Sequence, residues 1–140
     1  MQNSDEKFME RCFELAEEAR KRDDTPVGSL IVDSDGKILT EASEANRTDD
    51  LFDHAEFLAV RQTIKFRQNN DLSDCTLFTT NEPCFLCSFA IRQTRISRVV
   101  FAKKTLEIGG VSSNYPILSA NDVGYWKTAP EIVFLERIKK

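Results

Sequence analysis

One histidine and two closely spaced cysteines constrain this chain more than any other feature. Residues 54–56 read His-Ala-Glu and contain the only histidine, and residues 83–87 read Pro-Cys-Phe-Leu-Cys. One imidazole and two thiolates supply three of the four ligands that zinc prefers, which leaves the fourth position to water. A structural zinc site normally closes with a fourth Cys or His, and no second histidine exists. The spacing therefore predicts a catalytic Zn²⁺ site held by His54, Cys84 and Cys87.

The positions of these ligands relative to predicted helices strengthen the catalytic interpretation. One helical pattern begins at His54 and continues to about Arg67, and another runs from about Cys84 to Gln93 after a proline that suits a first turn. The positive end of a helix favours thiolate over thiol and lowers the pKa of zinc-bound water. Glu56 lies two residues after His54, in a first turn that can be irregular. We expect Glu56 to move protons beside the bound water without ligating the metal.

Composition predicts one domain that needs no disulfides. The 140 residues, 41% of them apolar, are enough for a single core spanning residues 1–140. The polar N-terminus and the absence of an apolar run of roughly 18 residues predict a cytoplasmic protein with no membrane partner. A net charge of −4 favours a small-molecule substrate over nucleic acid, because phosphate binding depends on clustered Lys and Arg.

Hydrophobic periodicity predicts an α/β fold. The helix at 8–22 carries Cys12 on its apolar face, and Cys75 opens a strand, so both are expected to be structural thiols. A hairpin turn at Asp33-Ser34-Asp35-Gly36 indicates an antiparallel pair, and the crossovers after the second and third helices indicate parallel strands. The result is a three-layer α/β/α sandwich around a five-stranded mixed sheet, with strands at 27–32, 37–42, 75–80, 96–101 and, as a candidate, 132–135.

Taken together, these motifs resemble the cytidine deaminase superfamily. The likeness covers nearly everything from Phe8 to Ala102, including Glu82-Pro83-Cys84 and the strand opening Thr25-Pro26-Val27-Gly28. It is greatest toward the branch that holds guanine deaminases, fungal-type cytosine deaminases and bacterial tRNA adenosine deaminases. The resemblance implies a zinc-dependent homodimer that releases ammonia from amino-substituted heterocycles.

The predicted substrate rests on the loop before the histidine and on the end of the chain. Asn46 and Asp53 are the candidate substrate contacts, with the alternative that Asp53 only caps the following helix. Residues 50–53 read Asp-Leu-Phe-Asp where the family often shows Asp-Pro-Thr-Ala, and the basic C-terminal helix of tRNA adenosine deaminases is replaced by a glycine- and aromatic-containing stretch. We expect a free base or small nucleoside-like amino heterocycle, with an aminopurine such as guanine ahead of cytosine. A tRNA adenosine deaminase is one alternative. A non-catalytic zinc-stabilised interaction domain, in which Glu56 is dispensable, is another.

Overall fold

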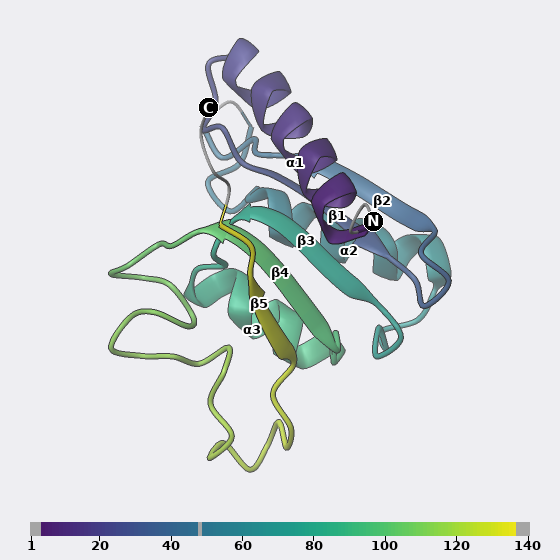
Figure 1. Cartoon of the computed structure of the whole chain (residues 1–140), viewed down its shortest axis with the longest axis vertical. Coiled ribbons are helices and arrows are strands. Elements are labelled where there is room, and N and C mark those ends of the chain that lie inside the picture. The colour runs from purple at the N-terminus through teal and green to yellow at the C-terminus, as the bar shows by residue number, and fades with distance from the viewer. Residues whose placement is uncertain (1–3, 48, 137–140) are drawn as a thin grey trace.

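The computed structural model describes residues 4–47 and 49–136 and contains one five-stranded sheet with helices on both faces (Figure 1). The strands lie in the order β2-β1-β3-β4-β5. β1 pairs antiparallel with both β2 and β3, whereas β3, β4 and β5 run parallel, so the predicted mixed sheet is confirmed. The elements are α1 (Ser4–Lys21), β1 (Gly28–Val32), β2 (Ile38–Ser43), α2 (Ala55–Arg67), β3 (Thr76–Asn81), α3 (Phe85–Thr94), β4 (Arg98–Lys103) and β5 (Glu131–Phe134).

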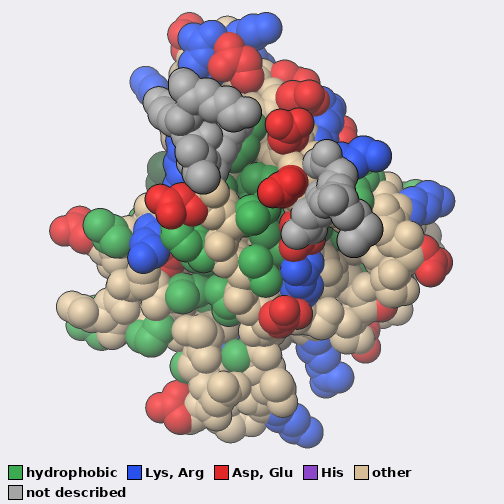
Figure 2. Space-filling view, in the orientation of Figure 1, with side chains coloured by type: hydrophobic (Ala, Val, Ile, Leu, Met, Phe, Trp, Pro, Cys, Tyr) green, Lys and Arg blue, Asp and Glu red, His purple; other side chains and the backbone are tan. Residues whose placement is uncertain are grey.

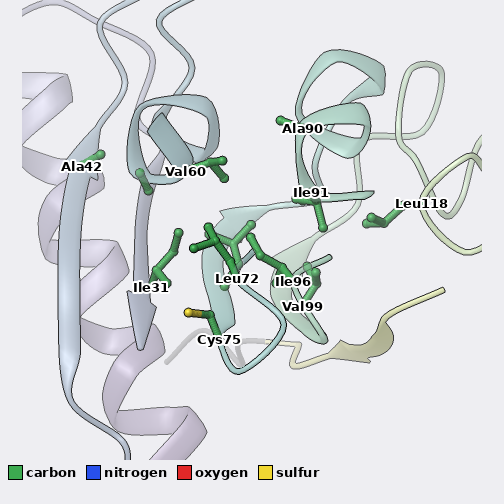
Figure 3. Packing of buried hydrophobic residues seen from close by; sticks show 12 residues of the cluster. Ile31, Ala42, Val60, Leu72, Cys75, Ala90, Ile91, Ile96, Val99 and Leu118 are labelled. Atoms are coloured by element: carbon green, nitrogen blue, oxygen red, sulfur yellow. The ribbon is translucent and has the colours of Figure 1, made fainter. Parts of the chain in front are cut away.

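Alternating strand residues divide the core into two layers, one on each face of the sheet. Leu30 and Phe78 pack against Cys12 of α1. Their neighbours along the strands, Ile31 and Leu77, pack into a separate cluster with α2 and α3 (Figure 3). Because successive strand side chains point to opposite faces, both sides of the sheet are covered, and the predicted three-layer sandwich is confirmed.

Helix α1 approaches β1 closely because the strand begins with glycine. A Cβ atom at Gly28 would collide with the backbone oxygen of Cys12 and the side chain of Leu15. The helix itself carries acidic residues in its first turn and basic residues in its last, as the helix dipole favours. Cys12 and Cys75 are both fully buried, in agreement with their prediction as structural thiols.

The fourth strand begins at Arg98, two residues later than the sequence pattern predicts. Arg95 ends α3 in the left-handed conformation, with φ of 65°, and the N–H of Ile96 donates back to the carbonyl of Ile91 at 3.3 Å. Ile96 is buried at 2% exposure and belongs to the core between the sheet and the helices. Its β-branched side chain therefore fills the core at the helix exit and does not start the strand.

The segment 104–130, which we call the excursion, joins β4 to β5 without a regular helix or strand (Figure 1). Most of its side chains are exposed or half-buried, and Leu118 is the one large apolar residue in it that is fully buried. Apolar side chains gather over β4 and β5, beside α1 (Figure 2). Within the described residues, no helix is long and apolar enough to cross a membrane.

Candidate metal centre

Two helix N-termini bring the predicted metal ligands together. His54 is the N-cap residue of α2 and Cys84 is the N-cap residue of α3, both with extended backbone. Neither side chain makes a capping hydrogen bond within the described residues, so both are available as ligands. Cys87 lies in the first turn of α3 and is fully buried. The histidine and the first cysteine thus both sit where helix dipoles add positive potential.

The distances among the three donor atoms fit a tetrahedral zinc ion. The Nδ1 atom of His54 lies 3.4 Å from the Sγ atom of Cys84 and 3.6 Å from the Sγ atom of Cys87. All three donor atoms lie within 4.8 Å of one another. Ligands at the usual Zn–S and Zn–N distances in a tetrahedron are about 3.5 Å apart. The donor set and its spacing therefore fit Zn²⁺.

The pKa shifts in this cluster make Cys84 the thiolate and leave Cys87 and His54 as its proton-bearing partners. The hydrogen bond from Cys87, followed by that from His54, lowers the pKa of Cys84 to about 4 in spite of burial. Hydrogen bonding to Cys84, together with burial, raises the pKa of Cys87 well above its ordinary value. The bond to the Cys84 thiolate raises the pKa of His54 to about 9, against the effect of burial. Zinc binding would release the remaining protons, because thiolate and neutral imidazole are the ligand forms.

Glu56 lies in the first turn of α2 and is only 4% exposed. Its carboxylate is outside the group of candidate metal ligands found among the described residues. Burial, and secondarily the Glu44 carboxylate, raises the pKa of Glu56 to about 8. A buried carboxyl group beside the ligands but separate from them is the arrangement that the sequence predicts, and its proton-transfer role stays a prediction.

Glu44 is a buried carboxylate that the sequence analysis missed. It is 5% exposed. Its Oε1 atom accepts a 2.6 Å hydrogen bond from the backbone N–H of Ala55, which lies eleven positions later in the chain. Burial raises the pKa of Glu44, against the effect of the Ala55 hydrogen bond. Glu44 therefore supplies an acceptor at the start of α2, between His54 and Glu56. A glutamate in a polar loop reads as surface charge, so no local pattern identifies it.

The two predicted substrate contacts flank the same loop. Asn46 is half-buried, and its Oδ1 atom accepts a long hydrogen bond of 3.5 Å from the Thr25 hydroxyl. The Asp53 carboxylate is 16% exposed and lies 3.9 Å from the guanidinium group of Arg61, a residue in the second turn of α2. The N–H group of Ala55, at the start of α2, is satisfied by Glu44 instead. Contact of Asn46 and Asp53 with a substrate stays a prediction.

Glu82 anchors the excursion beside the metal ligands. Its carboxylate is 1% exposed and accepts hydrogen bonds from the N–H groups of Thr105, Val111 and Ser112 and from the Ser112 hydroxyl. Burial raises the pKa of Glu82, but these bonds outweigh burial and hold the pKa below its usual range. An isolated β-bridge joins Cys84 to Gly109. The first part of the excursion therefore forms a wall next to Cys84.

Glycine is required where the excursion meets this carboxylate. A Cβ atom at Gly109 would collide with the Glu82 carboxylate, and one at Gly110 would collide with the Ser88 hydroxyl. In the sequence these two glycines belong to the glycine- and aromatic-containing stretch that follows Ala102. In the structure, the absence of side chains at these two positions lets the backbone of the excursion lie directly against Glu82 and against Ser88 of α3.

A family model described as the cytidine and deoxycytidylate deaminase zinc-binding region matches residues 2–103. The chain belongs to this family. The match includes all three metal ligands and Glu56, and the structure has the expected α/β fold. The cofactor that fits the site is therefore zinc, supported by both the family and the donor geometry.

Curated relatives include tRNA-specific adenosine deaminases. The chain is 37% identical over 112 residues to the protein of that name from Haemophilus influenzae, which covers 79% of this chain and 65% of the relative. It is 34% identical over 116 residues to the Aquifex aeolicus protein of the same name, covering 81% and 75%. The chain thus spans slightly less than two thirds of the Haemophilus influenzae relative.

Solved structures add two similar folds. A structure from a study of A-to-I editing by tRNA:A34 deaminases has a TM-score of 0.80 and 28% identity, covering 89% of this chain and 88% of that chain. A guanine deaminase from Bacillus subtilis has a TM-score of 0.67 and 34% identity, covering 74% and 66%. The likeness to the first structure extends over more of both chains.

Proposed function

We propose that this chain is a zinc-dependent hydrolytic deaminase that acts on adenosine in a tRNA. The observation that carries the chemistry is the convergence of His54, Cys84 and Cys87 beside the buried carboxylate of Glu56. Relatives named as tRNA-specific adenosine deaminases and the broad similarity to the tRNA:A34 deaminase structure support the substrate.

The proposed mechanism assigns one task to each group. His54, Cys84 and Cys87 would hold Zn²⁺, which lowers the pKa of a coordinated water to about 7 and so supplies a nucleophile at neutral pH. Glu56 accepts a proton from the attacking water and delivers it to the ring nitrogen beside the amino-bearing carbon. The new C–O bond forms as that carbon becomes electrophilic. Glu56 then carries the second proton to the amino group, the C–N bond breaks, and ammonia leaves.

The burial of Glu56 suits this work. A carboxyl group that is 4% exposed exchanges its proton with the substrate in preference to bulk water. Glu44 holds the backbone between His54 and Glu56, so the relative position of ligand and acid is fixed by a 2.6 Å hydrogen bond. Catalysis of proton transfer requires that fixed placement.

A free aminopurine is the second candidate substrate, although it is the substrate that the sequence by itself favours. The similarity to the Bacillus subtilis guanine deaminase and the net charge of −4 favour it. The curated relatives support the reverse order, because both of those reported above, at 37% and 34% identity, are named as tRNA-specific adenosine deaminases. A local basic surface can bind RNA on an acidic protein, so net charge is the weaker argument.

Ammonia release from a matched substrate panel tests the proposal. The zinc-loaded protein is incubated with an RNA anticodon stem-loop carrying adenosine at the first anticodon position, with free adenosine, and with guanine and cytosine. We expect ammonia from the stem-loop, and none from a stem-loop with guanosine at that position. Turnover of guanine without turnover of RNA would support the second candidate and reject the first. No ammonia from any substrate would favour the non-catalytic interaction domain.

A further inference from the structure

A second pocket lies at the opposite end of α3 from the metal ligands. It has a volume of about 560 Å³. It is lined by residues near the end of α3, by the residues that connect α3 to β4, and by residues 125–130 of the excursion. The excursion returns to the sheet near α3 just before β5 (Figure 1). With a rise of 1.5 Å per residue, a ten-residue helix separates its two ends by about 15 Å. The pocket is therefore distinct from the zinc site.

The pocket is cationic in a chain that is acidic overall. Arg92, Arg95 and Lys127 line it, and none of the residues that the structure places in its lining is an Asp or a Glu. The C-terminal end of a helix carries a partial charge of only about −0.5. The N–H groups of Arg95 and Ile96 also satisfy the carbonyls of Arg92 and Ile91 there. The Asp71 carboxylate interacts electrostatically with Arg95. Three positive charges outweigh this carboxylate and the partial charge of the helix end, so the pocket favours an anion.

Arg92 has a donor without an acceptor. The residue is 4% exposed, and its Nη1 atom donates to the carbonyl oxygens of Ile117, Leu118 and Ala120. Its Nη2 atom is buried and has no hydrogen-bond partner among residues 4–47 and 49–136. Burial lowers the pKa of Arg92, as expected for a cation removed from water. An unsatisfied buried donor is destabilising, and an anionic oxygen that accepts its hydrogen bond would offset that cost.

An aromatic wall stands beside these cations. The Arg92 guanidinium lies over the Trp126 ring at 5.0 Å from its centroid, and one side-chain hydrogen bond, to Gln93 at 2.6 Å, holds the indole N–H. Tyr125 is 77% exposed next to it. Trp126 therefore lies against the same guanidinium group that carries the unpartnered Nη2 atom. Arginine forks match phosphate geometry, and exposed aromatic rings stack on nucleobases.

We propose that this pocket binds a nucleotide unit, with its phosphate on Arg92, Arg95 and Lys127 and its base against Tyr125 and Trp126. The nucleotide comes from a free mononucleotide or from single-stranded RNA, which share this chemistry. The proposal does not depend on the reaction at the zinc site, because the two sites lie at opposite ends of α3 and the ligand needs no amino group.

Trp126 reports on the pocket directly because it is the only tryptophan in the chain. The fluorescence of the full-length zinc protein is measured at low salt during titration with inosine 5′-monophosphate, inosine, inorganic phosphate and a ten-residue oligouridylate. None of these carries an exocyclic amino group on a purine, so adenosine or guanine deamination cannot interfere. We expect saturable changes with the monophosphate or the oligouridylate, and changes with inosine or phosphate only at much higher concentration.

Pocket variants give the decisive comparison. Lys127→Asn and Arg95→Asn retain a residue that tolerates the positive φ angles of 61° and 65° at these positions. Each is expected to weaken binding by about three- to tenfold, the effect of one charge-assisted contact at a partly exposed site. Lys37→Asn removes a lysine from the exposed β1–β2 turn and should leave binding unchanged.

The outcomes separate the sources and test the proposal. Saturation by the monophosphate identifies a free nucleotide as a ligand, and saturation by the oligouridylate alone identifies RNA. The proposal is overturned if neither ligand changes Trp126 fluorescence in a saturable way. It is also overturned if inosine binds as tightly as its monophosphate, or if Lys37→Asn weakens binding as much as Lys127→Asn.

Discussion

At the scale of single residues, Glu56 is the side chain on which the proposed chemistry depends. Glu56→Gln keeps the size of the side chain but removes its ability to accept and return a proton. We expect the turnover number to fall by about 10²–10⁴-fold, the usual contribution of general acid–base catalysis. Zinc content and the thermal unfolding midpoint should change little, because Glu56 is not among the candidate metal ligands. A variant with normal turnover on a proven substrate would show that the proton carrier is another group.

The metal ligands give a second prediction at this scale. Cys84→Ser replaces a low-pKa thiolate with a hydroxyl that ligates zinc poorly, so the purified protein should contain well below one zinc ion per chain. Cys12→Ser and Cys75→Ser are matched controls, because both thiols are buried away from the cluster. Elemental analysis of the folded fractions decides the matter. Full zinc content in Cys84→Ser would contradict the proposed ligand set.

At the scale of elements, one carboxylate joins the excursion to the start of α3. Glu82→Gln replaces an accepting oxygen with an NH₂ group that faces backbone donors, and we expect a loss of about 1–3 kcal/mol in the free energy of unfolding. Urea unfolding measures this loss, and hydrogen exchange at residues 105–112 should accelerate.

Glu131→Gln is the control for this change. Glu131 pairs with Arg98 through a side chain that is 66% exposed, so its loss should cost less than about 1 kcal/mol. If both variants lost the same stability and exchange at 105–112 stayed slow, Glu82 would not anchor the excursion.

At the scale of the whole molecule, the prediction is a homodimer. It comes from the family resemblance and from the long segment between β4 and β5, whose exposed apolar side chains include Leu106, Ile108 and Tyr115. Multi-angle light scattering at assay concentrations should give about twice the chain mass of 16.0 kDa. A protein that is strictly monomeric and fully active under the same conditions would refute the prediction.

Local patterns in the sequence determine much of this protein. The apolar residues of α1 recur at helical spacing, and the turn at 33–36 predicts the first hairpin. The His-Ala-Glu and Pro-Cys-x-x-Cys motifs by themselves also indicate one metal site. These features are predictable because each depends on residues close together in the chain. The structure confirms the fold and brings the donor atoms of His54, Cys84 and Cys87 within 4.8 Å of one another.

Only the tertiary structure decides where buried charges find their partners. Glu44 and Glu82 resemble surface glutamates in sequence, yet both are buried and satisfied by backbone N–H groups from distant segments. Arg92 likewise meets carbonyl groups 25 or more positions away. Any glutamate or arginine can lie in water at little cost, so its identity does not reveal its burial. Burial follows from how the chain packs, because the cost of removing a charge from water is met only by partners that folding brings near.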